Sequence, residues 1–94
     1  MSAPTMQLTE VGAKRRREAA LEVAMPTAST VAIVLYNVLG QPVRVLWRGQ
    51  MEAGNHPLCW DGRDDHGVEC PSGLYYVGCQ AGNVTIMCRI HLSN

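Results

Sequence analysis

Residues 60–76, W-D-G-R-D-D-H-G-V-E-C-P-S-G-L-Y-Y, combine aromatic residues with a dense set of turn residues. Trp60 ends an apolar run and is large enough to centre a small core, because its burial removes on the order of 200 Å² of surface from water. Asp61-Gly62 turns the chain after it, and Pro71-Ser72-Gly73 bends the chain back before Tyr75 enters the core. The stretch therefore predicts two core strands joined by a structured loop.

Four acidic side chains of this stretch raise the possibility of a calcium loop: Asp61, Asp64, Asp65 and Glu69. Calcium takes about six to eight oxygen ligands, and the alternating D-x-D-x-D-G spacing of a calcium-binding loop is absent. Asp64, Asp65 and Gly67 instead fit a tight turn in which a carboxylate accepts hydrogen bonds from its own backbone. We expect turn chemistry here and no metal.

Short apolar runs, separated by turn residues about every ten positions, surround this stretch on both sides. The runs occupy residues 20–25, 31–36, 43–47, 56–60, 74–80 and 84–92. The last run alternates most cleanly between apolar and polar residues, which is typical of a strand with one buried face. The pattern predicts an all-β, antiparallel β-sandwich of six to seven strands.

The chain is short and has no net charge. Its 94 residues support one modest core, and the balance of eight basic and eight acidic residues gives no overall field that would attract nucleic acid. Residues 1–18 mix glycine, proline and charge without a sustained period, so we expect a flexible, disordered leader or linker there and a folded domain over 19–94.

The basic run Lys14 to Arg17 holds half of the basic charge. Flanking glutamates and the lack of interleaved aromatic residues favour a solvated segment over a patch for nucleic acid or for membranes. No apolar stretch has the length of a membrane span, and two glutamates interrupt the apolar segment that follows the basic run. We therefore expect neither a membrane span nor a signal peptide in this chain.

The four cysteines lie far apart in the sequence: Cys59, Cys70, Cys79 and Cys88. They form no C-x-x-C pair, so a structural zinc site is not expected. Cys79 and Cys88 fall on apolar faces of neighbouring runs, where a thiol can act as a small hydrophobic side chain. A Cys79–Cys88 disulfide is the alternative, and it requires Cα atoms within about 7 Å.

Catalytic chemistry has little support in the sequence. His56, His66 and His91 fall in separate segments, and no pattern of nucleophile, base and oxyanion hole joins them to a cysteine. A sandwich of this length also leaves little room for a substrate pocket. We expect no enzyme activity, no cofactor and no small-molecule substrate, with a small metal- or thiol-dependent protein as the alternative.

One strand carries apolar residues on both faces. Ala32 and Val34 fall on its outer face, and Leu46 or Trp47 must also point outward unless a bulge realigns the next strand. An exposed apolar strip on a sheet indicates either an interface or an aggregation hazard. We expect Ala32, Val34 and Trp47 to contact a protein partner or a preceding domain of the same parent chain.

A dozen landmarks follow one another in a specific linear order: Tyr36, Gly40, Trp60, Asp61, Gly62, Asp64, Asp65, Gly67, Ser72, Gly73, Tyr75 and Gly82. This order resembles the immunoglobulin-like domain of flagellar hook-capping proteins, and the likeness covers about 75 residues, from Leu21 to Leu92. It is also similar to C-terminal sorting domains of type IX secretion and to tail modules of bacterial secreted proteins.

This resemblance implies an immunoglobulin-like sandwich with a non-catalytic, structural or interaction role outside the cytoplasm. Such a module is usually the C-terminal domain of a larger secreted, surface or flagellar protein. In hook-capping proteins it belongs to a cap that assists the assembly of hook subunits. A sorting or anchoring domain for type IX secretion is the alternative, although the last run has a single basic residue, Arg89, where such domains commonly carry a pair.

Overall fold

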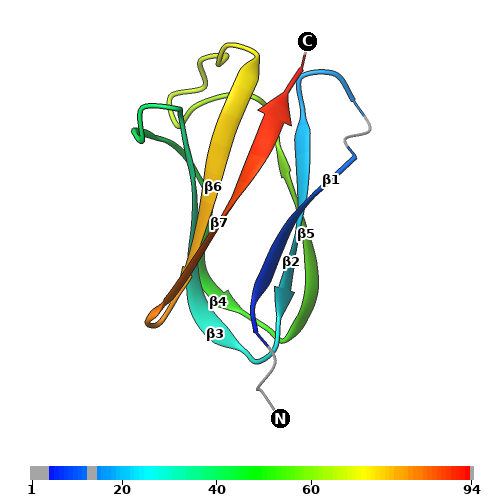
Figure 1. Cartoon of the computed structure of the whole chain (residues 1–94), viewed down its shortest axis with the longest axis vertical. Coiled ribbons are helices and arrows are strands. Elements are labelled where there is room, and N and C mark those ends of the chain that lie inside the picture. The colour runs from blue at the N-terminus through cyan, green and yellow to red at the C-terminus, as the bar shows by residue number, and fades with distance from the viewer. Residues whose placement is uncertain (1–4, 13–14, 94) are drawn as a thin grey trace.

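Seven strands and no helix make up the part of the chain that the computed structural model describes, residues 5–12 and 15–93 (Figure 1). The described residues accordingly contain no helix that could cross a membrane. The strands are β1 (Gln7–Val11), β2 (Ala19–Met25), β3 (Ser29–Tyr36), β4 (Pro42–Met51), β5 (Gly54–Trp60), β6 (Gly73–Ala81) and β7 (Val84–Leu92).

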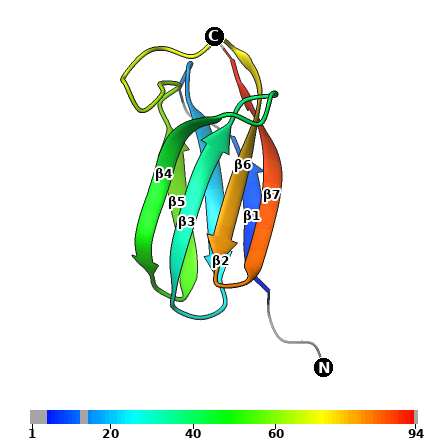
Figure 2. The same cartoon turned by 90° about the vertical axis from the view of Figure 1, so that its left-hand side faces the viewer.

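The strands form two antiparallel sheets packed face to face (Figure 2). One sheet has the order β1-β2-β5, and the other has the order β4-β3-β6-β7. The predicted all-β immunoglobulin-like sandwich is confirmed. The turn between β3 and β4 and the long loop between β5 and β6 lie at the same end of the sandwich as the C-terminus (Figure 1).

The core lies between the two sheets and follows the alternation of the sequence. Leu21 and Val23 of β2 face Ile33 and Leu35 of β3, and all four side chains are fully buried. Trp60, at the end of β5, is also completely buried. Because successive residues of a strand point to opposite faces, these inward positions leave Ala32 and Val34 on the outer face of the four-stranded sheet.

Strand β1 is the main difference from the expected leader. Residues 7–11 pair with β2 from Gln7 opposite Ala24 to Val11 opposite Ala20, and Met6 just before them is buried. The expectation of a leader over 1–18 is therefore wrong for this strand. Pairing with β2 supplies hydrogen-bond partners to the backbone of this mostly polar segment. The other residues of the expected leader include 1–4 and 13–14, which lie outside the described residues.

A bulge in β4 determines which of its consecutive apolar residues point inward and which point outward. Ile33 lies opposite Trp47 but Val34 lies opposite Val45, so Leu46 is the extra residue. Leu46 packs against the core, as a bulge permits. Trp47 is opposite an inward residue, not beside Ala32 and Val34, and it is 36% exposed at the sheet edge.

Candidate interaction surface

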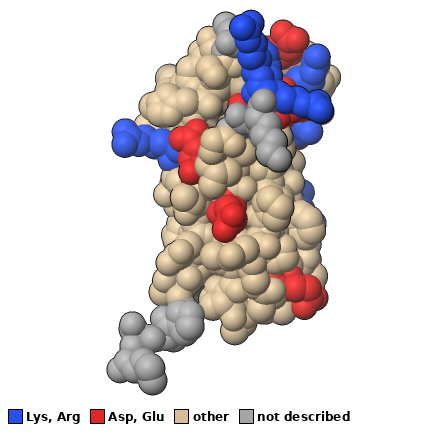
Figure 3. All heavy atoms as spheres, turned by 90° about the vertical axis from the view of Figure 1, so that its right-hand side faces the viewer, with Lys and Arg blue, Asp and Glu red and all other residues tan. Residues whose placement is uncertain are grey.

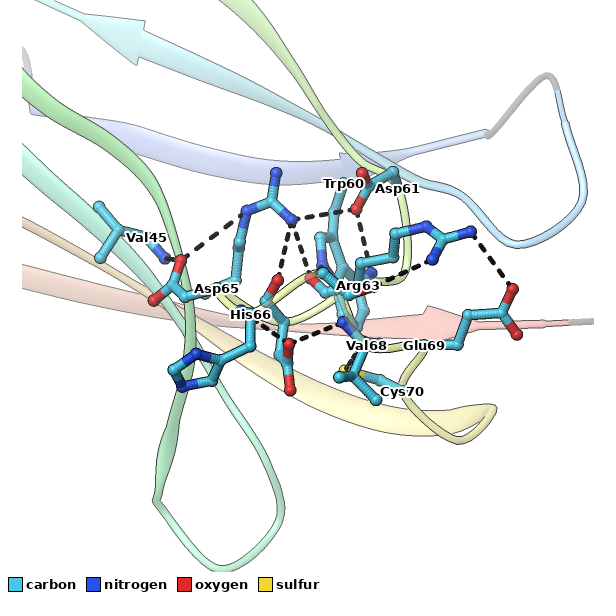
Figure 4. Close-up of polar contacts among 12 residues, drawn as sticks. Val45, Trp60, Asp61, Arg63, Asp65, His66, Val68, Glu69 and Cys70 are labelled. Atoms are coloured by element: carbon cyan, nitrogen blue, oxygen red, sulfur yellow. Dashed lines mark hydrogen bonds and ion pairs between the residues drawn. The ribbon is translucent and has the colours of Figure 1, made fainter.

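The loop between β5 and β6 is held in place by arginine side chains (Figure 4). Arg44 of β4 approaches Asp61 at 3.2 Å and Asp65 at 3.9 Å, and its Nη1 donates to the Arg63 carbonyl at 3.0 Å. Arg63 itself donates to the Gly67 carbonyl and pairs with Glu69 at 3.4 Å. These contacts tie the loop to the edge of β4.

Asp64 organises the tight turn inside this loop. Its Oδ1 accepts the backbone N–H groups of His66 at 2.8 Å and Val68 at 3.0 Å. The hydrogen bond from Val68, followed by that from His66, holds the pKa of the Asp64 carboxyl below its ordinary value. The acidic residues of the loop thus serve its backbone and its arginines, and no metal-binding cluster occurs among the described residues.

The aromatic residues anchor both ends of the loop to the core. Trp60 donates from its Nε1 to the Arg63 carbonyl at 2.8 Å. Its ring packs edge-on against Tyr75, with a centroid distance of 4.8 Å. The Tyr75 hydroxyl donates to the Pro71 carbonyl at 2.6 Å, which is the backbone contact of a tyrosine corner. Burial raises the pKa of this hydroxyl.

Arg17 belongs to this end of the fold, in contrast to the expected solvated run. Its backbone N–H donates to the Ser93 carbonyl at 3.0 Å, and its guanidinium donates to the Cys70 carbonyl at 2.8 Å. The Arg17 carbonyl lies so close to Gly62 that a Cβ there would be 2.9 Å away. Arg15 and Arg16 are exposed, and Lys14 lies outside the described residues.

The turn between β3 and β4 borders a groove at the same end. Asn37 Oδ1 accepts the N–H groups of Leu39 and Gln41, both at 3.0 Å, so the turn is internally braced. Val38 and Leu39 project from it and are 63% and 79% exposed. The groove has a volume of about 530 Å³ and runs between this turn and the residues that lead into β6.

The remaining landmark glycines have positive φ angles: Gly40, Gly67 and Gly82 lie in turns, and Gly73 is the first residue of β6. Ser72 lies in the bend before β6. Most of the twelve landmark residues therefore lie in the loops or in the core of the sandwich. Tyr36 is an exception, because it lies at the end of β3 on the outer face of the sheet.

All four cysteines are free thiols in the structure. Cys79 is buried with its Sγ 3.4 Å from Met6 Sδ, and Cys88 is half-buried against the core. Burial raises the pKa of both thiols. The exposed Cys59 donates to Glu18, and burial and this contact raise its pKa. Cys79 and Cys88 are therefore packing thiols, as expected, and no disulfide joins the four cysteines.

The outer face of the four-stranded sheet carries a continuous set of apolar residues. Cα partners on neighbouring strands share a face, so the register defines rows that cross the sheet. One row is entirely apolar and consists of Val45, Val34, Gly78 and Met87. Met87 is 59% exposed. The sheet that carries this row faces the viewer in Figure 2.

Gly78 makes this face hollow. The Tyr36 ring lies over it, and a Cβ at Gly78 would be 3.3 Å from the ring. Two shallow hollows, of about 470 and 130 Å³, share Tyr36 and Met87 as lining residues. The structure thus places the expected interface residues Ala32 and Val34 on this face and separates Trp47 from them.

Arg44 and Arg17 both hold the loop in place, but the sequence indicates this role for neither: Arg44 is not among the candidate residues, and Arg17 belongs to the basic run that we expect to be solvated. In the sequence, Arg44 differs from its neighbours only because it is a charged residue within the apolar run of β4. Its partners are 17 to 21 residues away along the chain, and those of Arg17 are further still. Contacts at such separation depend on the topology and leave no spacing in the sequence.

A protein-family model described as the FlgD Ig-like domain matches residues 7–84. The chain belongs to this family. The match begins at Gln7, the first residue of β1, and so includes the strand that was expected to be part of a leader. The resemblance to the hook-capping type of immunoglobulin-like domain is confirmed.

Named FlgD proteins support the same assignment. The basal-body rod modification proteins FlgD of Salmonella typhimurium (strain LT2) and Salmonella typhi are each 34% identical over 56 residues, which are 60% of this chain and 24% of each relative. The match thus spans about a quarter of their length. FlgD from Pseudomonas aeruginosa aligns with a TM-score of 0.61 and 28% identity over 90% of this chain and 65% of that one.

A second solved structure aligns less well with the chain. PorZ, a surface component of the type IX secretion system of Porphyromonas gingivalis, aligns over 79% of this chain and 9% of its own, with a TM-score of 0.49 and 18% identity. A likeness at this level says nothing about the function of the FlgD-type domain.

Proposed function

We propose that this chain is a non-catalytic interaction module of an extracytoplasmic bacterial assembly, and that it acts as one domain of a longer flagellar, secreted or surface protein. Its partner is a protein or a neighbouring domain of the same parent chain. Membership of the FlgD Ig-like domain family supports this role, as do the relatives named as basal-body rod modification proteins.

The observation that carries the proposal is the apolar row across the four-stranded sheet. Val34 and Met87 belong to it, and a folded monomer gains nothing from leaving such residues on a sheet face. A partner that covers the row removes this apolar area from water, which drives association. The braced loops at one end of the sandwich keep the sheet rigid, so that little ordering entropy is lost on binding.

Deletion of the domain tests its flagellar role. In the bacterium that encodes this chain, we expect removal of the codons for residues 7–92 to disturb flagellar rod or hook assembly, which electron microscopy of isolated basal bodies reports. Restoration with Met87→Asp should fail, because a carboxylate in the apolar row opposes burial. Restoration with Glu22→Asp, on the opposite sheet, should succeed.

Two outcomes contradict the flagellar assignment: normal basal bodies in the deletion strain, or a host that builds no flagellum. If the deletion disturbs assembly but Met87→Asp restores it fully, the module is flagellar and works through another surface. The folded state of each variant is checked by thermal unfolding of the purified domain.

A further inference from the structure

The strands of the larger sheet contain no acidic residue. Strands β3, β4, β6 and β7 have no aspartate or glutamate at any position, whereas they carry three arginines and one histidine. All eight acidic residues of the chain lie elsewhere. Acidic side chains are visible on the side formed by the other sheet (Figure 3), where β1 and β2 contribute Glu10 and Glu22.

Two of the four basic side chains already have structural roles. Arg44 pairs with Asp61 and Asp65 in the end loop. His91 lies beside Glu10, whose carboxylate also accepts the His91 backbone N–H at 2.9 Å and so links β7 to β1. These residues are held by carboxylates of the same chain.

The other two basic side chains, both arginines, are exposed and have no carboxylate partner in the described part of the chain. The side chains of Arg48 in β4 and Arg89 in β7 form no ion pair or hydrogen bond with any of the residues that the structure describes. Arg48 lies opposite Ala32, and Arg89 lies opposite Tyr76, so both share the outer face with the apolar row.

The register places the two arginines at opposite corners of this face. The row Arg48, Ala32, Gln80 and Thr85 lies on one side of the apolar row, and the row Pro42, Tyr36, Tyr76 and Arg89 lies on the other. Three strand spacings and four residues of strand separate the corners, which gives a distance of about 20 Å between their Cα atoms. The apolar row runs between them.

We infer that this face binds a protein surface that has an apolar centre and carboxylate groups on both sides of it, about 20 Å apart. The inference rests on the proposed function, because it takes this face to be the docking surface. A partner that covered the row without supplying carboxylates would desolvate two guanidinium groups and leave them unpaired, which is costly. A basic partner would be repelled at both corners.

The same features disfavour a nucleic acid as the occupant. A sheet that binds single strands uses exposed aromatic rings on which bases stack. The two tyrosines of this face, Tyr36 and Tyr76, are each half-buried, and the Tyr36 ring packs over Gly78. An apolar row also separates the two arginines. The chain as a whole has no net charge. Two carboxylate groups that flank an apolar segment are the better match.

Two synthetic peptides can test the inference on the isotope-labelled domain. The first is a helix of about 14 residues with leucines along one face and two glutamates at each end, which spans about 20 Å. The second has lysines in place of the glutamates. We expect the acidic peptide to bind at least ten-fold more tightly, with NMR shift changes confined to β3, β6, β7 and the Arg48 edge of β4.

Matched variants show whether the arginines cause the preference. The double variant Arg48→Glu and Arg89→Glu should reverse the preference, because both corners then attract lysine. Arg16→Glu is the control, since this exposed arginine lies outside both sheets. This variant should still bind the acidic peptide more tightly than the basic one. Folding of all variants is checked from the dispersion of their NMR spectra.

Several results would overturn the inference. These are equal affinity for the two peptides, no binding of either at 1 mM, shift changes on β2 and β5, or tighter binding of a single-stranded oligonucleotide. The result is independent of flagellar assembly in cells. A peptide preference without a flagellar defect would refute the flagellar role alone, and a flagellar defect without a preference would refute the carboxylate partner alone.

Discussion

Gly62 shows how a single residue fixes the end of the sandwich. Its φ is +79°, and the Arg17 carbonyl would lie 2.9 Å from an added Cβ. We expect Gly62→Ala to destabilise the domain by about 2–3 kcal/mol, because a left-handed backbone and a backbone clash are combined. Denaturant unfolding of the purified domain measures the change.

Gly67 is the matched control for this substitution. It has the same φ of +79°, but no atom would lie within 4 Å of an added Cβ. Gly67→Ala should therefore cost only the conformational strain, about 1 kcal/mol. Equal losses for the two variants would show that the Arg17 contact is unimportant.

Asp64 makes the stability of the loop dependent on pH. Its pKa is lowered in the folded state by the N–H groups of Val68 and His66. Its ionised form therefore stabilises the fold at neutral pH, and this contribution disappears as the pH falls from the ordinary aspartate pKa, about 3.9, through the lower folded value. Asp64→Asn keeps an acceptor oxygen but removes the charge.

We expect the difference in unfolding free energy between the native chain and Asp64→Asn to be largest near pH 6 and to shrink toward pH 2. Denaturant unfolding at several pH values measures this difference. Asp64 shares its loop with other carboxylates, so each variant is compared with the native chain at the same pH. A difference that stays constant with pH would contradict a role for the carboxylate charge.

At the scale of the elements, β1 is an integral strand of the domain. Met6 just before it is buried, and its sulfur lies 3.4 Å from the sulfur of Cys79 in β6. Met6→Ala should lower the unfolding free energy by about 2 kcal/mol, because it leaves a cavity between the sheets. Thermal or denaturant unfolding measures the loss.

Met87→Ala provides the control, because Met87 is largely exposed on the outer face of the sheet. Its loss should stay within about 0.5 kcal/mol. If Met6→Ala proved as mild as Met87→Ala, the segment before β1 would not contribute to the core.

The strands that alternate clearly were predictable from the sequence, and those with mixed patterns were not. Residues 84–92 alternate along their whole length, and β7 occupies the same residues. In β1 the sequence Q-L-T-E-V has only two apolar residues and follows a proline-containing segment, so pairing with β2 decides its structure. The bulge at Leu46 likewise depends on the register with β3.

The candidate surface was predictable in part. Ala32 and Val34 stood out because they are apolar at outward positions, and the structure places them on the apolar face. Trp47 is expected with them, but it lies opposite the inward Ile33, since the bulge reverses the direction that simple alternation gives. The rows of the outer face could not be predicted, because they depend on the register of four strands. These rows contain Gly78, Met87 and the two exposed arginines.

At the scale of the whole molecule, the two sheets have different characters. The larger sheet combines an apolar row with unpaired arginines and has no acidic residue in its strands, whereas the smaller sheet carries Glu10 and Glu22. The loops at one end are fixed by internal contacts of Arg44 and Asp64. We therefore infer that the end loops have a structural role and that the larger sheet is the docking surface.

Site-specific photo-cross-linking in living cells tests that division most directly. A benzophenone amino acid replaces Met87 on the larger sheet or Glu22 on the smaller one, both at exposed positions. The account predicts that position 87 gives a covalent adduct with a flagellar rod or hook protein, identified by mass spectrometry, and that position 22 does not. Adducts at position 22 alone, or the same adducts at both positions, would contradict it.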